Sequence, residues 1–396
     1  MKTIDVKKLP DFQSFCGTKF CLSHYARQVK DRRGEVKIPA STVFSAVFLM
    51  GAMGWGSLLR CDQMIRTPVG QRWFGRKTPP VSDSTMARSL QVMDLKTLQQ
   101  IWLASYRQGI NSGQSKYQLR SGKRRIGIID GSGFGRFLAS CFEIVGPTSL
   151  MVGLQPIPKR GKELPASYAR LRRIKHQLNA NFVDLILGDG LYLVAPFFNL
   201  CLGELNADVL IKTDDTTRQI IKDAMGLFAC KQQFPEGILT AEGADAVRMC
   251  YYQVTMADGF FLEKVDADLT VAWVVETHLR TGELTEFWVV TSAKKLLPQE
   301  VRELAHWRWD VENHGFKSLN QTVVTNGRST AKRIYSHDPT ASEAILLILF
   351  IVFNLLGLFL LRVSQRLTYP GMKPTRLFRI NLLRHYLIVL GYLFDG

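Results

Sequence analysis

The chain has 396 residues, of which 46% are hydrophobic and 21% charged, and these fractions exclude a disordered or fibrous protein. Its net charge of +17 favours a polyanionic partner, with nucleic acid ahead of an anionic membrane surface, although a charge that serves only solubility is the alternative. The seven cysteines are scattered without a C-x-x-C pair, which argues against a disulfide framework and a thiolate zinc site. Since the first residues have no apolar stretch of signal-peptide length, we expect a cytoplasmic protein.

Residues 1–115 are expected to form a helical domain. Apolar and helically periodic stretches flank a basic connector rich in Pro and Gly, "RTPVGQRWFGRKTPP", and Ser82 or Asp83 is the predicted N-cap of the helix that follows it. Two short helices around a turn would suit a helix-turn-helix reader of DNA. A helical pair that serves only for packing is the alternative.

Residues 116–215 predict a mixed α/β sheet covered by helices. A strand ending at Asp130 is followed by two further strands, a basic amphipathic helix over 164–180, a buried strand ending at Asp189, a second helix and another strand. The predicted order is therefore strand–strand–strand–helix–strand–helix–strand. This unit is the first part of the expected core.

Residues 216–292 alternate in hydrophobicity and predict a β-rich insertion, with hairpin turns at Asp258-Gly259 and Thr281-Gly282. A helix is expected to begin near Pro298, inside the second part of the core at 293–365, and residues 366–396 are expected to form a C-terminal helical tail. The apolar stretch 344–361 approaches the length of a membrane span. We expect it to be a core helix instead, because Asn354 in its middle is costly in lipid.

Asp130 and Asp189 are the first candidate functional residues, since each follows an apolar strand and precedes a glycine. Asp-Gly is also a common turn dipeptide, which is the alternative reading of both. If the two strands are parallel neighbours, the carboxylates meet at one edge of the sheet and need a cation between them. Oxygen ligands without a Cys or His cluster favour Mg²⁺ or Mn²⁺ over zinc.

Glu312 is the third candidate, on a predicted helix face that it shares with Arg308. An exposed Arg308–Glu312 ion pair would explain both residues at little energetic benefit. Alternatively, Glu312 completes a set of three carboxylates for two Mg²⁺ ions, with Arg308 and Lys317 close by to bind phosphate.

These residues resemble the DDE transposases of bacterial insertion sequences, whose catalytic core is ribonuclease H-like. The resemblance covers residues 120–360 and rests on "IIDGSG", "LGDGLY" and "RWDVENHGFKSL". It implies that Asp130, Asp189 and Glu312 are the catalytic metal ligands of two Mg²⁺ ions, which Mn²⁺ may replace. It further implies double-stranded DNA as the partner, both as element ends and as target, a homodimer on DNA, and a place at the bacterial nucleoid. In the third motif Ala305 and Leu319 stand where the family has Tyr and Lys, so His306, Trp307 or Lys317 would have to substitute.

The basic and aromatic residues near the acids are the candidates for contact with DNA. They are Arg308, Lys317, Trp307, Trp309, Lys123, Arg124 and Arg125. Three other functions stay open: a nuclease or resolvase with the same metal core, a catalytically inactive DNA-binding relative of a transposase, and a membrane protein anchored by residues 344–361.

Overall fold

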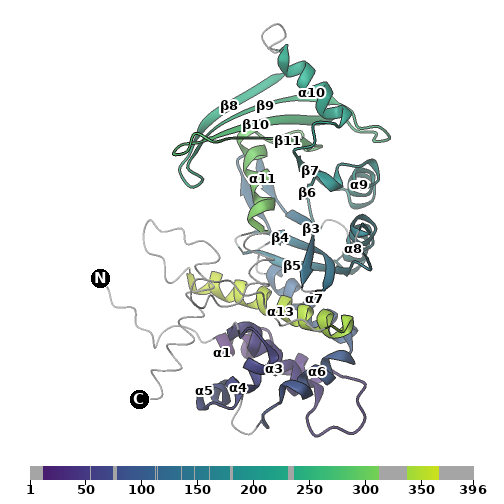
Figure 1. The fold of residues 1–396 in the computed structure, drawn as a ribbon, viewed down its shortest axis with the longest axis vertical. Coiled ribbons are helices and arrows are strands. Elements are labelled where there is room, and N and C mark those ends of the chain that lie inside the picture. The colour runs from purple at the N-terminus through teal and green to yellow at the C-terminus, as the bar shows by residue number, and fades with distance from the viewer. Residues whose placement is uncertain are drawn as a thin grey trace, which may run out of the picture.

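The computed structural model describes residues 12–364, apart from residues 54, 75–77, 112, 114, 135, 147, 160, 179–181, 231–235 and 312–336. A large mixed sheet flanked by helices forms one end of the molecule, and a set of helices from the N-terminal part forms the other (Figure 1). The long helix α13 (Pro339–Ser364) lies between these two parts. The fold is therefore α/β, as the sequence predicts.

The N-terminal part is helical, in agreement with the sequence. Its helices are α1 (Phe12–Thr18), α2 (Leu22–Gln28), α3 (Ala40–Met53), α4 (Leu58–Ile65), α5 (Pro68–Phe74), α6 (Asp83–Gln91) and α7 (Leu95–Asn111). Ser82 is the N-cap of α6, and its hydroxyl accepts a hydrogen bond from the backbone N–H of Thr85.

The remaining elements alternate between strands and helices. The strands are β1 (Tyr117–Leu119), β2 (Gly122–Arg124), β3 (Ile126–Phe134), β4 (Phe137–Val145), β5 (Leu150–Pro156), β6 (Leu185–Asp189), β7 (Asp208–Thr213), β8 (Ile238–Asp245), β9 (Cys250–Phe260), β10 (Leu269–His278) and β11 (Leu284–Thr291). The helices are α8 (Glu163–Leu178), α9 (Ala195–Asn199), α10 (Gln219–Ala229) and α11 (Pro298–Val311), with a 3₁₀ turn η2 (Gly190–Tyr192) and a π-helix η3 (Leu200–Leu205) beside α9.

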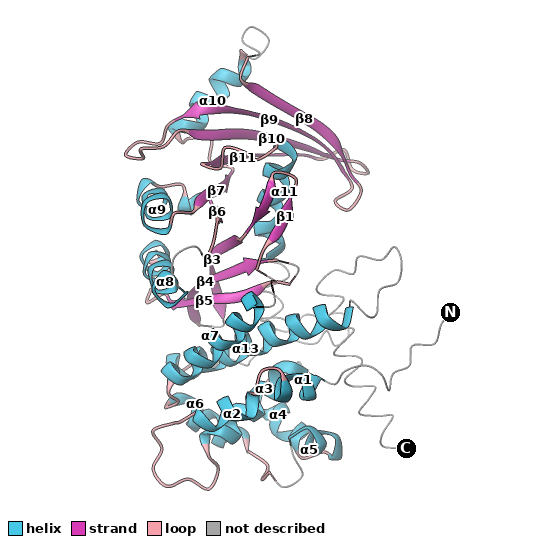
Figure 2. Ribbon diagram, turned by 180° about the vertical axis from the view of Figure 1, so that it is seen from behind, coloured by secondary structure: helices cyan, strands magenta, loops and turns pink. Residues whose placement is uncertain are grey.

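Nine strands form one continuous sheet in the order β5-β4-β3-β6-β7-β11-β10-β9-β8. Strand β3 is antiparallel to β4 and parallel to β6, which is in turn parallel to β7. The predicted order of strands and helices is confirmed from β3 to β7, whereas the preceding β1–β2 hairpin was not predicted. Helix α11 covers one side of β6 and β7, while α8 and α9 lie on the other side (Figure 2).

Two details of the predicted strands are wrong. Strand β3 does not end at Asp130, because its antiparallel pairing with β4 continues to the pair Phe134↔Phe137. Asp258-Gly259 is not the hairpin turn, since both residues belong to β9 and the connection to β10 spans residues 261–268. The reason lies in cross-strand side-chain bonds: the hydroxyl of Thr270 donates to Asp258, and the backbone N–H of Gly259 donates to Asp268.

The stretch 216–292 holds two further features. Strand β11 pairs with β7, so β8 to β11 extend the core sheet. Helix α10 lies within this stretch although the alternating pattern did not predict it. Its buried residues Ile220, Ile221, Ala224 and Phe228 follow the period of a helix. The predicted turn at Thr281-Gly282 is confirmed, with Gly282 at a φ of 69°.

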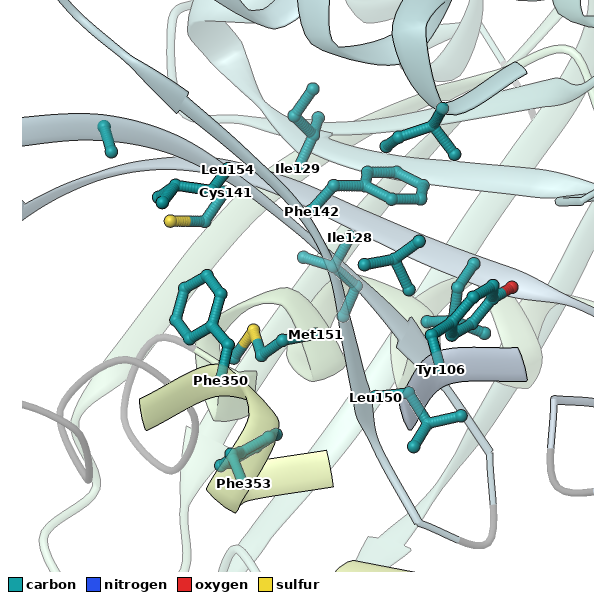
Figure 3. Packing of buried hydrophobic residues seen from close by; sticks show 14 of the residues in the cluster. Tyr106, Ile128, Ile129, Cys141, Phe142, Leu150, Met151, Leu154, Phe350 and Phe353 are labelled. Atoms are coloured by element: carbon teal, nitrogen blue, oxygen red, sulfur yellow. The ribbon is translucent and has the colours of Figure 1, made fainter. Parts of the chain in front are cut away.

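Helix α13 is anchored to the edge strand β5 by a fully buried asparagine. The side chain of Asn354 accepts from the backbone N–H of Met151 (2.7 Å) and donates to the carbonyl of Met151 (3.0 Å) and the hydroxyl of Ser105 (3.1 Å). Phe350 and Phe353 of the same helix take part in the apolar packing around Met151 (Figure 3). The helix thus covers a strand edge that would otherwise be open.

Within the described ranges, one helix is long and apolar enough to cross a membrane, Pro339–Phe359, and 94% of its apolar window is buried inside the protein. Helices α3 and α4 pass the same test only as a single span bent by 98°. A core helix meets the same criteria of length and composition, and the bonds of Asn354 are those of a helix packed against protein.

We predict that Asn354→Leu destabilises the protein by about 2 kcal/mol, because the backbone N–H of Met151 loses its buried acceptor. Urea unfolding followed by circular dichroism measures this change, with Gln100→Leu, a similar amide-to-leucine change at an exposed position of α7, as a comparison. An Asn354→Leu variant that is as stable as the wild type would contradict this packing. A variant that is soluble only in the presence of detergent would contradict it as well.

Candidate functional site

Asp130 and Asp189 lie at the same level of two neighbouring parallel strands. The pairing of β3 with β6 runs from Ile126↔Leu185 to Ile128↔Leu187, and the same offset brings Asp130 opposite Asp189. Adjacent strands are about 4.8 Å apart, and residues at one level direct their side chains to the same face. Both carboxylates are largely withdrawn from solvent, with exposed side-chain fractions of 11% and 32%.

Arg308 of α11 reaches both carboxylates. Its Nη2 atom lies 3.3 Å from Oδ2 of Asp189 and 3.9 Å from Oδ1 of Asp130. The other oxygen of Asp189, Oδ1, accepts a hydrogen bond from the backbone N–H of Leu191 (3.0 Å), which orients the carboxylate. The guanidinium side chain is only 12% exposed, so the attraction between these charges is weakly screened.

Helix α11 is held in place by the buried side chains of Arg302 and His306, six and two residues before Arg308. Glu276 of β10 accepts hydrogen bonds from Nε of Arg302 (2.5 Å) and from Nε2 of His306 (2.7 Å). Arg302 also donates to Asp245 (3.0 Å). Burial is the main cause that lowers the pKa of His306, and the nearby Glu276 carboxylate opposes it. These bonds fix the backbone from which Arg308 extends.

The first turn of α11 is fixed as well. The carboxylate of Glu300 accepts from the backbone N–H of Ser121 (2.9 Å) and from that of Leu297 (3.0 Å). Although burial acts in the opposite direction, these bonds hold the pKa of Glu300 below its usual value. The helix is therefore tied both to the β1–β2 hairpin and to β10.

Glu163, at the start of α8, is a further acid of this site that the sequence did not reveal. Its carboxylate accepts from the hydroxyl of Tyr192 (2.9 Å) and from the backbone N–H of Gly131. Burial raises the pKa of Glu163, and repulsion by Asp189 adds to this effect while Arg308 acts against it. Glu163 thus links the backbone beside Asp130 to the turn that follows Asp189.

The glycine after each aspartate is required for close packing. A Cβ on Gly131 would lie 2.2 Å from Oε2 of Glu163, and one on Gly190 would lie 2.7 Å from Oγ1 of Thr213. Neither glycine has a positive φ. The Asp-Gly dipeptides are therefore sites of close approach rather than turns that require left-handed backbone.

Lys212 of β7 is the second group that sequence reasoning missed. The parallel pairing of β6 with β7 places it opposite Asp189, and its ammonium group lies 3.9 Å from the ring centre of Phe287. Burial is the main cause that lowers the pKa of Lys212 to about 8, and Arg308 contributes by repulsion whereas Glu276 acts in the opposite direction.

The predicted basic cluster at 123–125 is only partly available to a ligand. Arg124 forms an ion pair with Asp208 (2.9 Å), and Arg125 forms one with Asp184 (2.6 Å). The side chain of Lys123, by contrast, is exposed. Two of the three residues therefore join elements of the fold to each other.

The remaining predicted residues divide into two groups. Trp307 is half-buried, and its ring packs edge-on against Tyr117 with centroids 4.3 Å apart. Glu312, Lys317 and the side chain of Trp309 lie outside the described part of the chain.

The carboxylate oxygens of Asp130 and Asp189 are suitable ligands for a divalent metal ion. In the part of the chain that the structure describes, no three His, Cys, Asp or Glu side chains are grouped as metal ligands. The carboxylates of Asp130 and Asp189 are nevertheless oxygen donors, which Mg²⁺ and Mn²⁺ prefer. The predicted third ligand, Glu312, directly follows the last residue of α11.

No protein-family model matches this chain, and a comparison with curated proteins likewise gives no match. The functional inference therefore rests on the geometry of Asp130, Asp189, Arg308 and their neighbours.

We predict that the stability of the protein rises between about pH 8 and pH 10.5 through Lys212. In this range the unfolded chain keeps a lysine proton that the folded chain has released. The free energy of unfolding therefore gains up to about 1.4 kcal/mol per pH unit from this residue. Unfolding of Lys212→Met over this range should lack that contribution.

The control is Lys222→Met, at an exposed position of α10, which should follow the wild-type pH profile. Parallel curves for Lys212→Met and the wild type would show that Lys212 is not perturbed by its burial.

Proposed function

We propose that this chain is a DDE-type transposase with a ribonuclease H-like core, which cuts DNA in a reaction that depends on divalent ions and joins the resulting end to a target. The observation that carries the proposal is the juxtaposition of Asp130 and Asp189 on parallel strands with Arg308 of a later helix. The strand order β5-β4-β3-β6-β7, antiparallel over the first three strands and parallel over the rest, supports this fold.

DNA as the substrate is supported by charge. The chain has a net charge of +17, Arg308 lies beside the carboxylate pair, and Lys212 stands opposite Asp189 on the neighbouring strand. A negatively charged backbone would bind favourably at such an edge. The resemblance to transposases further implies a homodimer on DNA and a place at the nucleoid.

In this mechanism Asp130 and Asp189 would hold the divalent ions, with Glu312 as the third ligand. Bound ions would supply positive charge that stabilises the attacking and leaving oxygens of the phosphodiester. Arg308 and Lys212 neutralise the charge that develops on the phosphate oxygens. Glu163 keeps the backbone at Gly131 fixed, so that the carboxylate of Asp130 stays in its orientation.

The test is Mg²⁺-dependent cleavage and strand transfer on DNA that carries the sequences flanking the gene. We predict that Asp130→Asn, Asp189→Asn and Glu312→Gln each lower both rates at least about 100-fold, because each removes a group that acts on developing charge. Glu204→Gln is the control, since Glu204 is exposed and pairs with Arg172 away from the site, so its rates should equal those of the wild type.

Three outcomes would lead to other functions. Cleavage without joining would favour a nuclease or resolvase that uses the same core. Specific DNA binding without cleavage would favour a catalytically inactive relative of a transposase. Cleavage that survives both aspartate substitutions would place the reaction elsewhere in the chain.

A further inference from the structure

A single nitrogen atom lies between the two carboxylates of the site. Nη2 of Arg308 is within 3.3 Å of Oδ2 of Asp189 and 3.9 Å of Oδ1 of Asp130. The positive charge of this guanidinium reduces the repulsion between the two anions. Its side chain is largely buried, so bulk counterions do not replace it in this role.

A divalent ion bound by the same oxygens would compete with Arg308. Mg²⁺ sits about 2.0–2.1 Å from its oxygen ligands, so an ion on Oδ2 of Asp189 would be within about 5.5 Å of Nη2. The positive charges of the ion and of Arg308 would then repel each other at short range. Both cations also use the same lone pairs on Asp130 and Asp189.

The backbone of α11 is held at two places. Arg302 and His306 tie α11 to Glu276, and Glu300 ties the start of the helix to Ser121. Withdrawal of the guanidinium from the two acids would therefore occur by rotation about the side-chain bonds of Arg308. A planar guanidinium released beside them has the geometry to bind a phosphate in a bidentate manner.

We propose that Arg308 is an internal counterion which divalent ions displace from Asp130 and Asp189, and that its release couples ion binding to the capture of a DNA phosphate. This proposal rests on the divalent-ion site of the proposed function. It adds a regulatory role: without ions, Arg308 is engaged by the acids and contributes little to binding DNA. With ions, it becomes a phosphate ligand at the place of cleavage.

The first test measures Mn²⁺ binding to the full-length protein in the absence of DNA, by the electron paramagnetic resonance signal of free Mn²⁺. The wild type is compared with Arg308→Gln and Arg308→Lys. We expect Arg308→Gln to bind Mn²⁺ about tenfold more tightly, within the 5- to 150-fold range of typical couplings. Arg308→Lys should fall between the two, since it keeps the charge but has a shorter reach.

Arg248→Gln is the charge-matched control. Arg248 lies 3.8 Å from Asp245 in the connection between β8 and β9, and its charge acts on Lys212 and His306. Loss of its charge should change the Mn²⁺ affinity by less than about twofold, because the ion pair of Arg248 is with Asp245. A change as large as that of Arg308→Gln would mean that general charge, and not direct competition, sets the affinity, and would overturn the proposal.

The failure of the switch is distinguishable from the failure of the site. If the wild type binds Mn²⁺ and Asp130→Asn abolishes this binding, the site exists. Unchanged or weaker binding by Arg308→Gln then overturns the switch alone. If Asp130→Asn and the wild type bind Mn²⁺ equally, or neither binds it, the ion site of the proposed function is wrong and the switch is overturned with it.

The second test addresses the release of Arg308. Fluorescence anisotropy measures binding to a short DNA duplex with EDTA or with Ca²⁺, which binds oxygen ligands but is expected not to support cleavage. We expect Ca²⁺ to strengthen DNA binding about tenfold in the wild type and by less than about threefold in Arg308→Gln. Equal strengthening in both proteins would overturn the coupling.

Discussion

Two carboxylates that stand at one level of neighbouring parallel strands repel each other and need positive charge between them. In this protein the guanidinium of Arg308 provides it. The pairing of β3 with β6 runs to Ile128↔Leu187, two residues before Asp130 and Asp189, and this register brings the two mutually repelling carboxylates close together. Arg308 approaches from one side of the sheet. Glu163 contributes a third acid nearby, with its pKa raised mainly by burial.

The rest of the fold holds this arrangement in place. Helix α11 must be rigid to present Arg308, and two buried networks, at Glu300 and at Glu276, fix it to separate elements. At the far edge of the sheet, Asn354 of α13 hydrogen-bonds to Met151 of β5 and so packs the helix against the sheet edge. Rigid secondary structure rather than loop therefore carries the groups of the site, an arrangement suited to chemistry that depends on position.

The features that depend on local sequence patterns, such as the order of strands and helices, could be predicted. Contacts between residues far apart in the chain could not. Apolar runs and turn residues gave the order of strands and helices from β3 to β7, and the single Asn in an apolar stretch pointed to a packed core helix. The role of Lys212 depends on the residue that stands opposite it on a distant strand, and that of Glu163 on the packing of α8 against Gly131 and Tyr192; no local pattern encodes either. Arg124 and Arg125 are interpreted from the sequence as part of a basic cluster because their ion-pair partners, Asp208 and Asp184, lie far from them in the sequence.

The central claim is that Asp130 and Asp189 together bind divalent ions, and the most direct measurement is anomalous X-ray diffraction from crystals of the protein grown with Mn²⁺. The account predicts a strong anomalous peak within about 2.5 Å of oxygens from both carboxylates, with Arg308 displaced from them. A map without a peak at this edge of the sheet, at Mn²⁺ concentrations that saturate binding in solution, would contradict it.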